Sequence, residues 1–228
     1  AAFGTDDAII SGDALHNLAF QVMLAEPTPE RVAATACLAG ATSAMLAGQA
    51  ADMVFDDLPV VSFDDCLAME ADKTGALLGC AASIGAVLAG APQTTVDALD
   101  SFGRELGLAF QAVDDVLGIW GDPAVTGKAA GNDLRERKKS MPVAVVLTGG
   151  SSGAEDLAAI YDRPGDLSDD DVVRATGIID AAGGRERTEA EAADRLESAL
   201  ASLDALEIPA EVDTEIRGLA RFVVERSF

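Results

Sequence analysis

Residues 110–142 of this chain combine paired carboxylates, paired lysines and a glycine-rich loop in the order FQAVDDVLGIWGDPAVTGKAAGNDLRERKKSMP. If residues 110–118 form a helix, Gln111, Asp114 and Asp115 lie three or four positions apart and share one face. Two adjacent carboxylates beside an amide form an oxygen-rich rim. Such a rim suits Mg²⁺, which binds few protein carboxylates and completes its coordination with water and phosphate oxygens. The stretch therefore predicts a site for a metal-bound polyphosphate.

The loop after this helix carries an excess of positive charge. Residues 128–139 hold five basic side chains, including Lys128 and Lys138, against Asp133 and Glu136. The whole chain has 16 Lys and Arg against 39 Asp and Glu, a net charge of −23. A basic segment in so acidic a chain indicates an anionic ligand. Taken singly, an Asp pair is typical of a solvated helix end, and a basic run is typical of an exposed face. The occurrence of both features, in this order, within one stretch favours the phosphate site.

Composition restricts the remaining possibilities. An apolar content of 49% in 228 residues is enough for a core. Cys37, Cys66 and Cys80 are odd in number and lack a CxxC spacing, so we expect thiols in a reducing cytoplasm, without disulfides or a zinc site. A single histidine, His16, excludes a histidine metal cluster. The net charge and an aromatic content of 4% disfavour nucleic-acid binding.

The elements that position these residues are predicted to be helices. Eight prolines fall at segment edges. Thr28 before Pro29 is a helix start, and capping boxes are predicted at Ser62/Asp65, Thr94/Asp97, Ser152/Glu155 and Ser168/Asp171. Strand signals are almost absent, which indicates an all-α bundle in a single domain, residues 1–228. The expected helices cover residues 6–25, 29–57, 63–90, 96–120, 142–147, 154–161, 169–182, 185–206 and 210–226.

Residues 74–92 form a run of nineteen without charge, long enough to cross a bilayer. Their glycine and alanine content favours a helix buried in a soluble bundle, so we expect no stable membrane span. Small side chains on this helix suit close helix packing, and equally suit the wall of a tunnel for an apolar chain.

The motifs together resemble those of the trans-isoprenyl diphosphate synthases, or polyprenyl synthetases, of the farnesyl and geranylgeranyl type. The stretch described above resembles the second aspartate-rich region of that family. Three further motifs follow the family's order: Gly12-Asp13-Ala14-Leu15 with Ala19-Phe20, Gly48-Gln49-x-x-Asp52, and Lys73-Thr74. The resemblance runs from about residue 3 to residue 142, with looser similarity beyond.

Two departures from the family pattern affect the expected site. The third carboxylate of the DDxxD motif is replaced by Gly118, and Asp122, one turn further on, is a candidate substitute. The resemblance also begins after the region that carries the family's first aspartate-rich motif and its isopentenyl diphosphate site. We therefore expect the domain to be N-terminally incomplete in this sequence.

The resemblance implies an isoprenoid-synthase-type helical bundle around a central cavity, working as a homodimer. It implies a Mg²⁺-dependent prenyltransferase that joins isopentenyl diphosphate to an allylic diphosphate. Asp114 and Asp115 would then bind magnesium. The implied diphosphate contacts and pocket residues are Lys73, Lys128, Lys138, Thr74, Gln111 and, more weakly, Gln49 with Asp52.

Three alternatives stay open from the sequence. A class I terpene cyclase shares the fold and the metal-triggered ionisation, although the lysine-threonine and GQxxD motifs favour chain elongation. A non-catalytic partner or scaffold-associated subunit would keep the fold with half of the site. A generic acidic helical interaction protein would show no magnesium-dependent diphosphate binding. The length of the product is not determined by this sequence.

Overall fold

The computed structural model describes residues 4–127, 130–150 and 152–224, and within them the chain is helical without strands. This confirms the predicted all-α class. The elements are α1 (Thr5–Leu24), α2 (Pro29–Asp57), α3 (Phe63–Glu70), the π-helix η1 (Ala71–Gly75), α4 (Ala76–Leu88), α5 (Gln93–Trp120), α6 (Pro123–Thr126), α7 (Asn132–Arg135), α8 (Met141–Thr148), α9 (Ser152–Tyr161), α10 (Asp169–Ala181), α11 (Gly184–Ser202) and α12 (Ala210–Val224).

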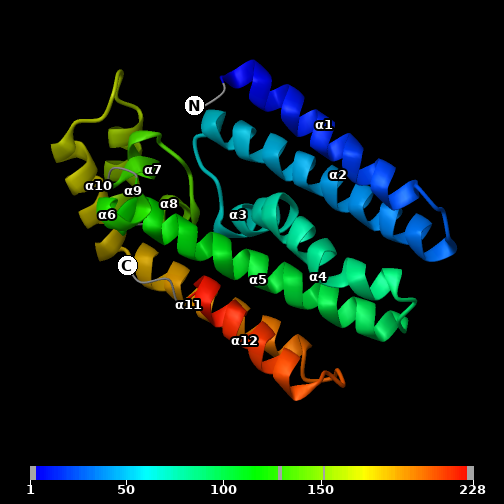
Figure 1. Ribbon diagram of the computed structural model, residues 1–228. Coiled ribbons are helices and arrows are strands. Elements are labelled where there is room, and N and C mark those ends of the chain that lie inside the picture. The colour runs from blue at the N-terminus through cyan, green and yellow to red at the C-terminus, as the bar shows by residue number, and fades with distance from the viewer. Residues whose placement is uncertain (1–3, 128–129, 151, 225–228) are drawn as a thin grey trace.

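The long helices run side by side in successive rows (Figure 1). Helix α1 folds back on α2, α2 packs on α4 and η1, α4 packs on α5, and α11 lies along the other side of α5 with α12 outside it. The short helices α7 to α10 gather at one end of α5. Helix α5 is therefore the central element, and its buried face includes Phe102, Leu106, Val113 and Val116.

Local signals set several helix starts as predicted. The Thr28 hydroxyl accepts a hydrogen bond from the Arg31 N–H before Pro29. Reciprocal capping boxes are present at Ser62 and at Ser168.

Two other capping predictions have different outcomes. The predicted box at Thr94 is wrong, because α5 begins at Gln93, directly after Pro92, and Thr94 lies inside the helix. The side chain of Ser152 lies outside the described part of the chain, so its predicted box is not seen.

Glycines allow the helices around the centre to approach closely. A Cβ on Gly103 would lie 2.3 Å from the Leu78 carbonyl oxygen, and one on Gly107 would lie 2.8 Å from the Gly75 Cα. The backbones of α5, α4 and η1 therefore meet directly, which no larger side chain would permit.

The expected helix over residues 63–90 is divided in the structure. A π-helical turn, in which the Ala76 N–H bonds to the Ala71 carbonyl five residues earlier, separates α3 from α4. Such turns insert one residue into a helix and re-aim the neighbouring side chains. This one contains Lys73 and Thr74, so it sets the direction of two predicted site residues.

The apolar run at residues 74–92 is shared between η1 and α4, which buries Ala76, Gly79, Cys80 and Ser83. Among the described helices, the one long and apolar enough to cross a bilayer is instead α2, with 17% of the qualifying window buried. Cys66 and Cys80 are buried and Cys37 is half-buried, and all three are free thiols.

Candidate functional site

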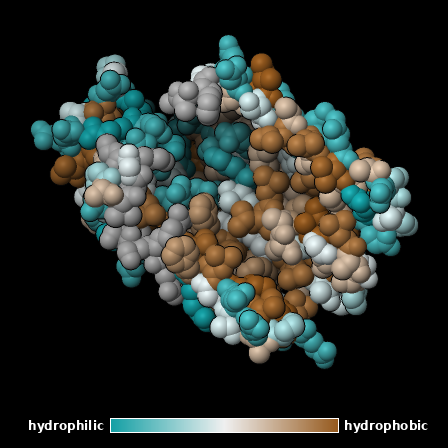
Figure 2. Space-filling model, viewed as in Figure 1, coloured by the Kyte–Doolittle hydropathy of each residue, from teal (hydrophilic) through white to brown (hydrophobic). Residues whose placement is uncertain are grey.

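A polar pocket lies where the C-terminal end of α2, the junction of α3 and η1, the middle of α5 and the segment before α8 meet. In Figure 2 hydrophilic side chains line a hollow between the end of α2 and the chain that follows α5. The lining residues are Asp52, Phe55, Asp56, Met69, Glu70, Lys73, Gln111, Asp114, Asp115, Asp133, Lys138, Lys139 and Ser140. Six acidic side chains against three lysines give the pocket a negative balance, which favours a cation with its anionic ligand.

Asp114 and Asp115 lie in different environments although they are adjacent. Asp114 is exposed, and no described residue forms an ion pair or hydrogen bond with its carboxylate. Asp115 is 6% exposed; its Oδ2 accepts the Met141 N–H at 2.9 Å and its Oδ1 accepts the Gln111 amide at 3.3 Å. Both residues were expected on the magnesium side of the site, Asp114 more strongly, and that role stays a prediction. In the structure the exposed Asp114 carboxylate faces the pocket, whereas Asp115 ties α5 to the start of α8.

Glu70 is a buried acid that the sequence reasoning missed. It is 2% exposed, lines the pocket, and hydrogen bonds to Asp115. Burial, reinforced by the negative charge of Asp115, raises the pKa of Glu70 well above its usual range. Burial also raises the pKa of Asp115 to about 6. Burial and the neighbouring charge of Asp115 therefore favour the neutral form of the Glu70 carboxyl.

A chain of hydrogen bonds joins this buried pair to η1. The Thr74 hydroxyl donates to Oε1 of Gln111 at 3.2 Å, and the Gln111 amide donates in turn to Asp115. Gln111 lines the pocket, whereas Thr74 is absent from the lining and contacts it through its hydrogen bond to Gln111.

Lys73 faces the pocket and forms an ion pair with Asp52 of α2. The side chains are 30% and 34% exposed, so the pair is accessible to a ligand. Gly48 explains how the two helices come so near, because a Cβ at this position would lie 2.3 Å from the Lys73 nitrogen. Gln49, the other predicted residue of this motif, is exposed and stands outside the pocket lining.

Asp133 occupies the position where the missing third carboxylate was expected. A Cβ on Gly118 would lie 2.1 Å from Oδ2 of Asp133, so the glycine makes room for this carboxylate. Asp133 is 6% exposed and forms an ion pair with Lys138 at 3.4 Å. Asp122, the candidate substitute, instead caps α6 by accepting the Ala124 N–H at 2.8 Å. In the sequence, the signal that could have identified Asp133 as a site residue was its place in the GNDL segment that begins at Gly131.

Lys138 and Lys139 reach the pocket from the segment after α7. Lys138 is 46% exposed and lies between Asp133 and Glu136. Although burial alone would lower the pKa of Lys138, the two carboxylates raise it, so its ammonium stays charged. Lys139 donates to the carbonyls of Phe55 and Asp56, at 2.9 and 3.0 Å, and so holds the end of α2. Lys128, the third predicted lysine, lies outside the described residues.

Two buried polar atoms in this pocket have no hydrogen-bond partner among the described residues. They are Oε2 of Glu70 and Oγ of Ser140. Buried polar atoms are nearly always paired, so these two are available to water or to a bound ligand.

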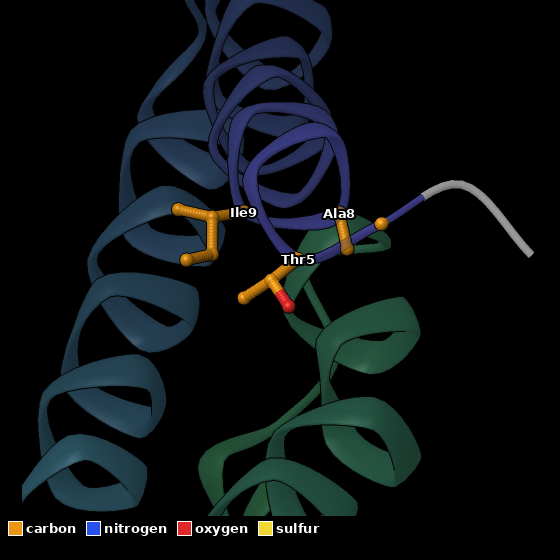
Figure 3. Close-up of a pocket in the computed structure, with 4 residues that line it drawn as sticks. Thr5, Ala8 and Ile9 are labelled. Atoms are coloured by element: carbon orange, nitrogen blue, oxygen red, sulfur yellow. The ribbon is translucent and has the colours of Figure 1, made fainter. Parts of the chain in front are cut away.

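A second hollow lies at the start of α1, and its lining carries no charge. The lining residues are Gly4, Thr5, Ala8 and Ile9 (Figure 3).

Comparisons with known proteins identify relatives of this chain. The family model described as polyprenyl synthetase matches residues 1–179. A (2E,6E)-farnesyl diphosphate synthase of Mycobacterium tuberculosis is 40% identical over 99% of this chain and 64% of its own length. A geranylgeranyl diphosphate synthase of the same organism is 44% identical over 92% of this chain and 60% of its own. The chain therefore spans less than two thirds of the length of these relatives.

Solved structures show the same fold. A polyprenyl synthetase from Streptomyces coelicolor superposes with a TM-score of 0.90 at 44% identity, covering 97% of this chain and 68% of that one. The sequence match and the fold agree over most of the chain. This chain belongs to the polyprenyl synthetase family.

Proposed function

We propose that this chain forms one wall of the active site of a Mg²⁺-dependent prenyltransferase, which joins isopentenyl diphosphate to an allylic diphosphate to make a longer trans-prenyl diphosphate. The observation that carries the proposal is the state of Asp114. It is an exposed carboxylate without an ion-pair or hydrogen-bond partner among the described residues, and it shares a pocket with Lys73 and Lys138. Relatives named farnesyl and geranylgeranyl diphosphate synthase support the reaction class.

The donor set fits magnesium. Asp114 offers free carboxylate oxygens, and the Asp133 carboxylate stands beside Gly118, one helical turn further along α5. Hard oxygen donors in small number, with room for water and phosphate, are what Mg²⁺ requires. When bound, the ion would stabilise the negative charge that develops on the leaving diphosphate.

The remaining residues of the pocket have separate tasks in this proposal. Lys73 and Lys138 place fixed positive charge against the diphosphate, so that its departure is favoured. The hydrogen bonds of Thr74, Gln111 and Asp115 hold η1, which carries Lys73, to α5 and α5 to the start of α8. In this scheme no side chain forms a covalent bond to the substrate.

A cytoplasmic homodimer completes the proposal. Helices α1 and α2 expose many large apolar side chains, which are Ile9, Ile10, Leu15, Leu18, Val22, Val32, Leu46, Met53 and Val54. Apolar patches of this extent mark surfaces that are covered by a partner. A second copy of the chain is the occupant that the family resemblance implies.

The proposal is tested by Asp114→Asn in the full-length protein, with Asp97→Asn, an exposed carboxylate elsewhere on α5, as the matched control. We expect the rate of magnesium-dependent condensation to fall by at least about a hundredfold for Asp114→Asn, as for other groups that stabilise transition-state charge. Helicity and the control rate should not change. Unchanged turnover in Asp114→Asn would overturn the assignment. Product formed without isopentenyl diphosphate would instead indicate a cyclase.

A further inference from the structure

The backbone that leads into Lys138 has an uncommon conformation. At the end of α7 the Lys138 N–H bonds to the Asp133 carbonyl at 2.9 Å, and the Arg137 N–H bonds to the Leu134 carbonyl at 3.0 Å. These two bonds form the Schellman ending of a helix, whose first residue beyond the cap is left-handed and usually glycine. Here that residue is Arg137, with φ of 53°, the one non-glycine residue of the described chain with positive φ.

The Arg137 side chain forms hydrogen bonds that a glycine at this position could not form. Its Nη2 donates to the Arg163 carbonyl at 2.9 Å and to the Gly165 carbonyl, both in the connection between α9 and α10. Left-handed backbone is unfavourable for L residues and persists where surrounding contacts hold it. The guanidinium therefore anchors the turn to a segment almost thirty residues further along the chain.

Tyr161, the last residue of α9, holds the same turn from another side. Its hydroxyl donates to the Lys138 carbonyl at 3.1 Å. Both backbone polar groups of Lys138 are thus engaged, the N–H by α7 and the carbonyl by α9. With the backbone fixed at both ends, the Lys138 side chain is directed towards Asp133 and the pocket.

We propose that Arg137 and Tyr161 are positioning residues, which clamp the Lys138 backbone so that its ammonium group stands ready for the diphosphate. Neither side chain lines the pocket, so both act through Lys138. The inference rests on the proposed function, in which Lys138 neutralises the diphosphate. It gives the connection between α9 and α10, remote in sequence from the metal-binding motif, a role in substrate affinity.

A purely structural role predicts a different pattern of effects. If these contacts only stabilised the fold, their loss would lower the melting temperature and leave substrate affinity unchanged. Arg137→Gly separates the two roles, because glycine relieves the left-handed strain while removing the anchor. The fold should therefore lose little stability, and the lysine should lose its fixed position.

The experiment compares Tyr161→Phe and Arg137→Gly in the full-length protein, each alone and combined with Lys138→Ala. In the single variants we expect KM for the allylic diphosphate to rise about threefold to tenfold, the range that one hydrogen bond supplies, with kcat nearly unchanged. In the Lys138→Ala background neither change should raise KM further. Arg174→Ala, which removes an exposed ion pair of α10 with Asp156, is the matched control and should leave KM unchanged.

Two results would overturn the clamp: an unchanged KM in the folded single variants, or an equal rise of KM in the Lys138→Ala background. Failure of the proposed function would look different, because wild-type protein and Lys138→Ala would then respond identically to magnesium pyrophosphate in a thermal shift. Hydrogen exchange of the Lys138 amide tests the clamp in either case. We expect its protection to fall in both clamp variants, and unchanged protection would refute the inference.

Discussion

The contact between Gly48 and the backbone of Lys73 sets the distance between α2 and η1, and Gly48→Ala tests it. The added Cβ would lie 2.3 Å from the Lys73 nitrogen and 2.7 Å from its Cα, whereas ordinary contact begins at 3.4 Å. The backbone of η1 must then retreat by about 1 Å, since no flexible side chain is there to yield. The retreat also separates Lys73 from Asp52, its partner in the pocket.

The size of the effect can be isolated with Gly40→Ala in the same helix. Gly40 has no neighbour within 4 Å of its added Cβ. Both substitutions gain about 1 kcal/mol of helix propensity, so this contribution cancels when the variants are compared. The difference in unfolding free energy is then the steric penalty, about 1–3 kcal/mol for overpacking and near the upper end because the obstacle is backbone. For a chain of this size, a penalty of about 1–3 kcal/mol lowers the melting temperature by roughly 2–12 °C.

The assay is thermal unfolding followed by circular dichroism, for both variants and the wild type, in the full-length protein. We expect Gly40→Ala to melt slightly above the wild type and Gly48→Ala clearly below it. Equal melting temperatures for the two variants would refute the reasoning, because the close approach of α2 and η1 would then not exist at this position.

Two further predictions concern single contacts. Gly118→Ala places a Cβ 2.1 Å from Oδ2 of Asp133, so the carboxylate must move. We expect the condensation rate to fall by about tenfold to a hundredfold. An unchanged rate would contradict this prediction. The Ser168 hydroxyl bonds to Asp171 and is the main cause that lowers the pKa of that carboxyl, so Ser168→Ala should raise this pKa in an NMR titration. Because the folded pKa lies below the unfolded one, the stabilisation by charged Asp171 is present at neutral pH and is lost as pH falls through the folded pKa. In urea unfolding, the difference in unfolding free energy between wild type and Ser168→Ala should therefore become smaller as the pH is lowered. A difference that does not change with pH would contradict the link between the Asp171 pKa and stability.

Much of the fold could be predicted because its signals are local. Proline at segment edges and serine caps at Ser62 and Ser168 act within a few residues, so the sequence is sufficient to place these helix ends. The π-helical turn at η1 could not be predicted in this way. It depends on the packing of its Gly75 against α5, a contact between segments about thirty residues apart.

The site shows the same division. Asp114, Lys73 and Lys138 could be named from their motifs, since each motif is contiguous and its residue types suit magnesium and phosphate. Glu70 and Asp133 were missed as site residues, because their roles depend on burial and on neighbours from other helices. The opposite environments of Asp114 and Asp115 were also invisible, because which of two adjacent side chains faces solvent depends on what packs against the helix.

The sequence by itself determined the helical class, the family and the region proposed to bind a diphosphate, because periodicity, caps and short motifs are encoded in neighbouring residues. Only the tertiary structure decided that Asp114 is exposed, that Asp115 accepts a hydrogen bond from Met141, and that Gly118 leaves room for Asp133. It also decided that Arg137 and Tyr161 hold Lys138 in place. These properties arise from desolvation and from hydrogen bonds between distant segments, and both exist only once the helices have packed.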